Sequence, residues 1–166
     1  MIGLLECLKA SRRTSWRNPI SIRGISRSRG ATLVQYGALP YRLTKTHSIE
    51  LLLVTSREAK RWIIPKGWPI DGLKPFKSAA QEAYEEAGIR GVIGKTAVGT
   101  YSYKKAGRTI SCRITVFPLL VRDQRRRWPE KHQRSTKWVS LRKAIALITE
   151  KELRALISEF RSPKYI

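Results

Sequence analysis

The chain has 166 residues and a formal net charge of +22, because 34 lysines and arginines face only 12 aspartates and glutamates. This length, with 42% hydrophobic residues, suits one domain with a buried core, and no window approaches the roughly 18 consecutive apolar residues of a membrane-spanning helix. Two isolated cysteines, Cys7 and Cys112, argue against a disulfide scaffold and favour a reducing cytoplasm, and the charge predicts anionic partners such as polyphosphates, nucleic acid or an acidic surface.

Residues 1–28 differ from the rest in composition, since Glu6 is their only acid and few apolar residues follow Leu8. We expect a basic, flexible segment here, followed by one folded domain over residues 29–162. A solvated tail is the simplest role for the segment. Contact with nucleic acid or a membrane surface is an alternative, and the composition also resembles an organelle transit peptide.

Three strands are predicted ahead of residue 67. Residues 31–36 form a short apolar run, and residues 49–54 (IELLLV) form a continuous one that is typical of a buried strand. Between these two runs, Gly37, Pro40 and the sequence KTHS predict turns. Residues 62–64 (WII) form a short strand that leads into the next element.

Residues 67–89, GWPIDGLKPFKSAAQEAYEEAGI, predict a loop followed by an amphipathic helix. Pro75 suits the first helical position, and Gly88 suits the C-terminal cap. Three glutamates at i, i+3 and i+4 share one face within a single turn: Glu82, Glu85 and Glu86. The opposite face is a narrow apolar stripe suited to packing on a sheet, made of Phe76, Ala80, Ala83 and Ala87.

The three glutamates suggest a metal site. Like charges at this spacing repel each other by roughly a few tenths of a kcal/mol per pair, and a divalent cation reverses the sign of that interaction. Ligands that are all oxygen suit Mg²⁺, with Mn²⁺ as an alternative. A solvated cluster is the ordinary interpretation. However, Asp71 and these glutamates are four of only 12 acids, and Gly67 lets the backbone approach a ligand closely.

After the helix, residues 98–104 and 110–121 predict a hairpin joined by a turn at residues 105–108. Pro118 indicates an edge position or a bulge in the longer strand. Residues 137–139 (KWV) form a final short strand.

Two amphipathic helices are predicted at the C-terminal end, with structural roles. Their apolar positions are Leu141, Ala144, Ile145 and Ile148 in the first helix and Leu153, Leu156, Ile157 and Phe160 in the second. Thr149 followed by Glu152 makes a capping-box signature for the second helix. His47 and His132 are lone histidines in polar stretches, so a Ser-His-Asp site is unsupported.

The segment 67–89 resembles the Nudix box, whose pattern is Gly, five residues, Glu, seven residues, Arg-Glu, an aliphatic, any residue, Glu-Glu, any residue, Gly, an aliphatic. The residues that match in register are Gly67, Glu82, Glu85, Glu86, Gly88 and Ile89. Leu73 stands where the pattern has Glu, Gln81 stands where it has Arg, and Ala83 is a small form of the aliphatic. Replacing residues that support metal ligands without binding the metal themselves typically lowers metal affinity or activity by about 10–100-fold without abolishing them. We therefore expect an active enzyme.

The resemblance implies an α/β fold of the Nudix type, an α/β/α sandwich with a mixed sheet and a loop–helix–loop catalytic motif. It also implies metal-dependent hydrolysis of a diphosphate linked to another group, X, by in-line attack of water on phosphorus. Glu85 and Glu86 would bind the metal with a backbone carbonyl near Gly67, and Glu82 would be a third ligand or the base that deprotonates water. Gln81 takes the place of an arginine that orients a catalytic carboxylate in the family.

Outside the box, Asp123 and Glu130 are the acids that lie in the following strand and loop. Other features resemble the diphosphoinositol polyphosphate phosphohydrolase branch, whose members also cleave dinucleoside polyphosphates. These features are Ser56-Arg57 ahead of Arg61-Trp62, the Gly107-Arg108-Thr109 turn, and Arg134 ahead of Trp138-Val139. A polyanionic substrate needs lysines and arginines around it, and the predicted phosphate contacts are Arg29, Arg57, Lys66, Arg108 and Arg134.

Two alternatives stay open. The substrate could be a nucleotide such as diadenosine tetraphosphate, with Trp68 or Tyr101 stacking on a base, while oxidised nucleotides and RNA caps are weaker options. From a different class, a catalytically weak protein of the same fold could act as a basic module that binds RNA or another anion. The sequence leaves the oligomeric state undetermined.

Overall fold

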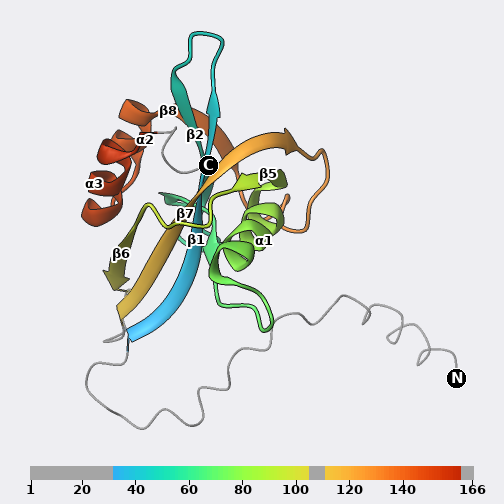
Figure 1. The fold of residues 1–166 in the computed structure, drawn as a ribbon, viewed down its shortest axis with the longest axis vertical. Coiled ribbons are helices and arrows are strands. Elements are labelled where there is room, and N and C mark those ends of the chain that lie inside the picture. Colours follow the sequence, from blue (N-terminus) through green and yellow to red (C-terminus); the bar gives the residue numbers. More distant parts are fainter. Residues whose placement is uncertain (1–31, 105–110, 162–166) are drawn as a thin grey trace, which may run out of the picture.

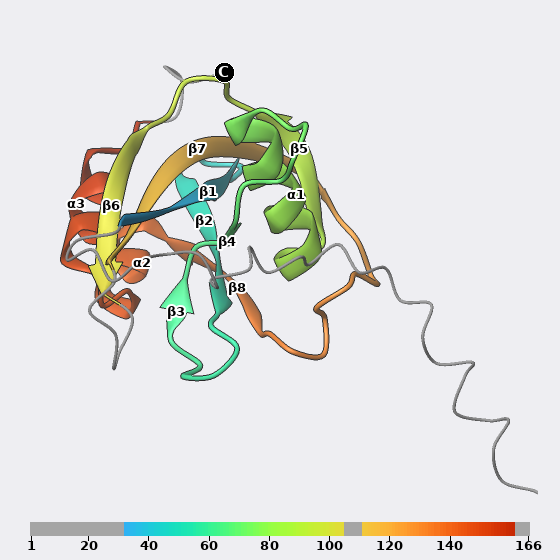
Figure 2. The same cartoon turned by 90° about the horizontal axis from the view of Figure 1, so that it is seen from below.

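The computed structural model describes residues 32–104 and 111–161, so the segment 1–28 and the turn predicted at 105–108 lie outside the described residues. The described residues form one mixed eight-stranded sheet. Helix α1 (Pro75–Ala87) covers one face, and the helices α2 (Leu141–Leu147) and α3 (Lys151–Glu159) cover the other (Figures 1 and 2). The expected α/β/α sandwich is therefore confirmed.

The sheet is built around a long parallel pair of strands. The strands in chain order are β1 (Thr32–Leu43), β2 (Ile49–Thr55), β3 (Trp62–Ile63), β4 (Lys66–Gly67), β5 (Ile89–Ile93), β6 (Gly99–Lys104), β7 (Ser111–Gln124) and β8 (Thr136–Ser140). Strands β1 and β7 run parallel in the middle. Strands β2 and β4 pair with β1, β5 and β6 pair with β7, and β3 and β8 pair with β2, all of them antiparallel.

Strand β1 is longer than the sequence predicted, because it continues through Gly37 and Pro40. A Cβ on Gly37 would lie 3.1 Å from the Ile114 side chain, so a glycine lets the neighbouring side chains pack over the strand. The Ala38 N–H donates to the Pro65 carbonyl oxygen, and residues two apart on a strand face the same side. The nitrogen of Pro40 therefore faces the interval between the partners β4 and β2, where the sheet requires no donor.

Pro118 follows the same rule in strand β7, which is central, so the prediction of an edge or a bulge at this residue is wrong. The Pro118 carbonyl oxygen accepts from the Gly94 N–H, between the end of β5 and the start of β6. The proline thus lies where the outer partner of β7 changes from β6 to β5. The register shift of this strand pair occurs instead opposite Arg90 and Gly91.

Helix α1 begins at Pro75 as predicted, and Gly88 caps it in the left-handed region with a φ of 69°. The Gly88 N–H donates to the Tyr84 carbonyl oxygen. The buried face differs by one position from the predicted stripe, since Ala79 is fully buried and Ala80 is only half-buried. Residues of α1 pack against a hydrophobic cluster made of Ala38, Leu52, Val54, Ile63, Ile89, Phe117 and Leu119.

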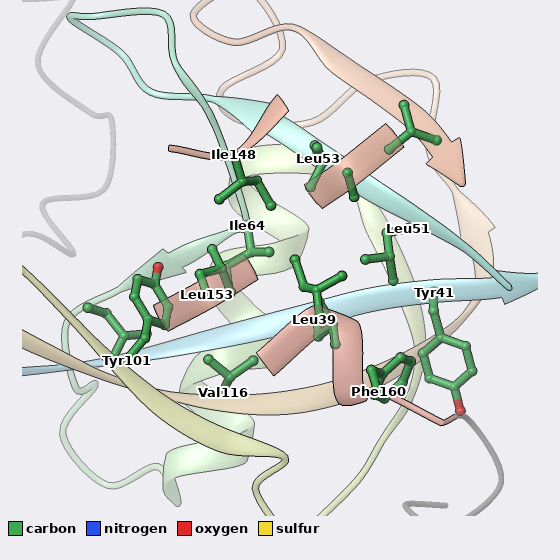
Figure 3. Packing of buried hydrophobic residues seen from close by; sticks show 14 of the residues in the cluster. Leu39, Tyr41, Leu51, Leu53, Ile64, Tyr101, Val116, Ile148, Leu153 and Phe160 are labelled. Atoms are coloured by element: carbon green, nitrogen blue, oxygen red, sulfur yellow. The ribbon is translucent and has the colours of Figure 1, made fainter. Parts of the chain in front are cut away.

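The second hydrophobic cluster lies between the sheet and helices α2 and α3. It extends from Tyr101, at one end, to Tyr41 and Phe160, whose rings contact each other at the other end (Figure 3). The side chain of Ser140 caps α2 by accepting from the Lys143 N–H. The predicted capping box of α3 does not form. Its N-cap is Glu150, without a side-chain capping bond.

The Glu152 carboxylate instead accepts the Ser102 N–H on β6, at 2.8 Å. The Glu152 side chain thus satisfies a backbone N–H on the edge of β6 that faces away from β7. Among the helices of the described residues, none has the length and apolarity needed to cross a membrane.

Candidate active site

Strand β4 and the acidic face of α1 meet at the dipeptide Lys66–Gly67. A Cβ placed on Gly67 would lie 2.0 Å from the Glu82 carboxyl carbon, so only glycine leaves room for this carboxylate against the backbone. The sequence predicted a close approach at Gly67. In the structure, the group that approaches is a carboxylate of the box itself.

Glu86 is not on an exposed face, because its exposed fraction is 3%. One carboxylate oxygen accepts the Lys66 N–H at 3.2 Å, and the other accepts from the guanidinium of Arg134. Burial raises the pKa of Glu86 to about 7, against the lowering effects of Arg134 and Lys66. Two of the three glutamates, Glu82 and Glu86, therefore lie against the same dipeptide.

Arg134 lies just ahead of β8 and is the centre of a buried network. Its Nε donates to Glu130 Oε2 at 2.6 Å, its Nη1 donates to the Thr55 carbonyl oxygen at 2.8 Å, and its Nη2 donates to Glu86. The side chains of Arg134 and Glu130 are 6% and 4% exposed. Arg134, predicted to contact phosphate, is thus held by acceptors of the protein, and Glu130 joins the site through Arg134.

Glu85 and Gln81 form a separate pair on the outer side of the helix. Gln81 Nε2 donates to Glu85 Oε1 at 2.7 Å, so the residue in the position of the box arginine still holds a box carboxylate. Within residues 32–104 and 111–161, no three His, Cys, Asp or Glu side chains are placed together to hold a metal ion. The predicted ligands are therefore only partly brought together.

The oxygen atoms near Lys66–Gly67 are of the chemical type that binds a hard divalent cation. Carboxylates and backbone carbonyls are the ligands that Mg²⁺ prefers, and the glycine leaves space for Glu82 beside the backbone. The residues that would hold the ion are Glu82, Glu86 and the carbonyl near Gly67. Glu85, the other predicted ligand, is held by Gln81 in this structure.

Two of the five predicted phosphate contacts touch Glu86 in the structure: Arg134 through its guanidinium, and Lys66 through its backbone N–H. The Lys66 Nζ lies 5.6 Å from the centroid of the Tyr103 ring, and burial lowers the pKa of Lys66 while Glu86 opposes that shift. Arg57 is exposed on the turn between β2 and β3. Arg29 and Arg108 lie outside the described residues.

The two predicted base-stacking residues have opposite environments. Trp68 follows Gly67 directly in the sequence and is 45% exposed, so part of its ring is accessible. Tyr101 is 2% exposed within the cluster under α2 and α3, so it cannot stack on a base. Leu73, which replaces a glutamate of the box pattern, is also 45% exposed.

Sequence reasoning missed the role of the β7–β8 loop, residues 125–135, which docks on the C-terminal end of α1. The Arg125 N–H donates to the Gly88 carbonyl oxygen, and the Glu130 N–H donates to the Glu85 carbonyl oxygen. A Cβ on Gly88 would lie 2.6 Å from the Trp128 ring. The i, i+4 spacing of Glu130 and Arg134 was a visible signal, but nothing local indicated Glu86 as their partner.

Asp123, the other acid considered outside the box, lies at the far end of β7. It forms a half-exposed ion pair with Arg125 at 3.0 Å. This contact places it with the loop rather than with Lys66–Gly67.

Comparisons with known proteins identify relatives of this chain. The chain is 36% identical over 132 residues to Nudix hydrolase 21, chloroplastic, of Arabidopsis thaliana, which covers 77% of this chain and 66% of that protein. It is 30% identical over 100 residues to the mouse diphosphoinositol polyphosphate phosphohydrolase 3-alpha, covering 59% of this chain and 58% of that protein. No family model matches the chain.

Among solved structures, a Caenorhabditis elegans Ap4A hydrolase in a binary complex has a TM-score of 0.61 and 26% identity. The match covers 76% of this chain and 93% of that one. The fold is therefore shared across most of the described residues.

Proposed function

The chain belongs to the Nudix hydrolase family, as a Nudix pyrophosphohydrolase, and we propose that it hydrolyses a diphosphate bond in a phosphate-rich substrate by metal-dependent attack of water on phosphorus. The observation that carries this proposal is the convergence of Glu82 and Glu86 on Lys66–Gly67. The match to the plant relative spans 66% of that protein's length.

Each residue of the site has a distinct part in the proposed reaction. A bound divalent ion would neutralise phosphate oxygens and lower the pKa of a water molecule. Glu86 and Glu82 would hold that ion, and Glu82 is the candidate for the base if it is not a ligand. The Lys66 side chain, whose Nζ lies 5.6 Å from the centroid of the Tyr103 ring, would contact a phosphate of the substrate.

Two substrate classes deserve separate tests. A diphosphoinositol polyphosphate is supported by the mouse relative and by the net charge of +22, which favours a polyanion. A dinucleoside polyphosphate is supported by the likeness to the Ap4A hydrolase and by Trp68, whose ring is accessible next to Gly67 and could stack on a base. The exposed tryptophan favours the second class, because an inositol ring offers no base to stack.

A substrate panel tests the proposal: an inositol pyrophosphate, diadenosine tetraphosphate, ADP-ribose and an oxidised nucleoside triphosphate, each with Mg²⁺, with Mn²⁺ and with chelator. We expect metal-dependent phosphate or nucleotide release from a substrate of the first two classes. Glu82→Gln should lower turnover by orders of magnitude. Trp68→Ala should raise KM for the dinucleotide and leave KM for the inositol compound unchanged.

The alternative, a basic module that binds RNA or another anion with little catalysis, predicts the opposite result. It would give RNA binding whose affinity falls steeply with salt, and no hydrolysis of any compound in the panel. The cytoplasmic location also stays a prediction, since the name of the plant relative assigns that protein to the chloroplast.

A further inference from the structure

Arg134 joins three elements that are distant in the sequence. Its guanidinium donates to Glu86 of helix α1, to Glu130 of the β7–β8 loop and to the carbonyl of Thr55 at the end of β2. The Ser135 N–H also donates to Thr55 Oγ1 at 2.9 Å, so the backbone next to Arg134 is anchored to the same strand. The planar guanidinium is therefore fixed on more than one side.

This geometry holds the Glu86 carboxylate and leaves part of it available. A carboxylate offers about four lone-pair sites. Arg134 takes a site on one oxygen of Glu86, and the Lys66 N–H takes a site on the other. Each oxygen of Glu86 thus keeps an acceptor site, and the carboxylate cannot rotate freely between them.

The charges around Glu86 also favour a cation at this site. Alone, a guanidinium next to Glu86 would compete with a metal ion for its negative charge. Glu130 lies on the same guanidinium at 2.6 Å and offsets that positive charge. With both carboxylates ionised, the group of Glu86, Arg134 and Glu130 carries one net negative charge, which favours a cation at Lys66–Gly67.

We propose that Arg134 is a positioning residue that acts through Glu86: it fixes the orientation of this carboxylate for a divalent ion, and Glu130 neutralises its charge so that the ion is not repelled. This inference rests on the function proposed above. It assigns Arg134 to the metal side of the site and not to direct phosphate contact.

A double-mutant cycle with Mn²⁺ alone tests the inference without any substrate. Calorimetry at one alkaline pH would compare wild type, Arg134→Gln, Glu86→Gln and the double variant. We expect Arg134→Gln to weaken Mn²⁺ binding by about 10–100-fold in the wild-type background. In the Glu86→Gln background, the same change should have an effect of less than about twofold, because its route of action is gone.

Three further variants define the mechanism. Glu130→Gln keeps the shape of the network and should weaken Mn²⁺ binding, because the guanidinium charge is then unopposed. Arg134→Lys keeps the charge but cannot make three planar bonds, so it should restore only part of the affinity. Arg127→Gln is the matched control, an exposed arginine of the same loop, and should leave Mn²⁺ affinity and the melting temperature unchanged.

Kinetics separate positioning from phosphate contact. A positioning role predicts that kcat falls in Arg134→Lys while KM for the substrate changes by less than about twofold. A higher KM with unchanged Mn²⁺ affinity would indicate that Arg134 contacts a phosphate of the substrate directly, and it would overturn the inference. Equal losses of Mn²⁺ affinity with and without Glu86 would overturn it as well.

If Arg134→Gln does not fold, the same double-mutant cycle can be made by combining Arg134→Lys or Glu130→Gln with Glu86→Gln. If no substrate is hydrolysed, the proposed function fails. The Mn²⁺ cycle still decides on Arg134.

Discussion

Single residues of the box act here through the space they leave as much as through their chemistry. Gly67 is the clearest example, because a Cβ at this position would lie 2.0 Å from the Glu82 carboxyl carbon. Glu86 differs from what its helical spacing suggested. Its carboxylate is buried against Arg134 and is not on an exposed face. Helical spacing gives the face of a side chain, and it does not give the neighbours that cover that face.

Gly67→Ala should displace Glu82 and lower turnover by orders of magnitude, with weaker Mn²⁺ binding, because the new methyl group occupies the place of the carboxylate. Turnover and calorimetry would measure both effects. Combined with Glu82→Gln, the alanine should add little, since both changes act on one side chain. Full additivity of the two changes would contradict this account.

Gln81→Arg alone should help little, because an arginine here would pair with Glu85, which Gln81 already contacts at 2.7 Å, and would compete with a metal for its charge. Leu73→Glu restores the acid that accompanies this arginine in the box pattern. The double change should therefore exceed the sum of the single changes by about 0.5–3 kcal/mol in transition-state stabilisation. Turnover against Mg²⁺ concentration for all four proteins measures this, and strict additivity would mean that the two positions are uncoupled.

At the level of elements, the sequence predicted best what depends on neighbouring residues. Helix α1 has the predicted first residue, Pro75, and the predicted cap, Gly88, because both signals are local. The sequence predicts that the first strand ends before Gly37, because a glycine and a proline inside a strand resemble a turn. In the structure, β1 continues to Leu43. The capping box of α3 failed for a similar reason, because Glu152 finds a donor on β6.

The docking of the β7–β8 loop on α1 gives a prediction for Gly88→Ala. The left-handed φ of 69° is unfavourable for alanine, and the methyl group would also lie 2.6 Å from the Trp128 ring. We expect a loss of about 1–3 kcal/mol in the free energy of unfolding from the strained backbone, with a further loss from the contact. Denaturant unfolding measures the change.

Gly72→Ala is the matched control for this prediction. Gly72 has a φ of 77° and no atom within 4 Å of the place of a Cβ, so it reports the backbone strain alone. Gly88→Ala should be the more destabilising of the two. Equal losses would show that the Trp128 contact contributes nothing.

For the whole molecule, the sequence predicted the layers of the fold but not the contacts that cross between its elements. The layers were predictable, because a central amphipathic helix between strands, followed by terminal helices, requires a sheet with two covered faces. The partners of Glu86 were not predictable, since they lie 20 and 48 residues away in sequence. The candidate carboxylates could therefore be proposed from the sequence, whereas their network could not.

Deletion of residues 1–25 should leave the melting temperature and the hydrolysis of small substrates nearly unchanged, because this segment is poor in apolar residues. Retention on nucleic acid should weaken, since several arginines are lost. A full-length variant with Arg12, Arg13 and Arg17 replaced by Gln separates charge from length. A deletion that fails to fold would place the segment within the domain and move its boundary.

The parallel pairing of β1 with β7 has a consequence for the order of folding. Thr32 pairs with Ser111, and Thr55 contacts Arg134, each at a sequence separation of 79 residues. Contacts this distant in sequence form slowly, because a long loop must close before they contribute. During synthesis, helix α1 and its three glutamates leave the ribosome well before β7 and Arg134. The nascent chain thus carries an acidic helix whose Glu86 still lacks Arg134, and the network becomes complete only when β8 has paired with β2.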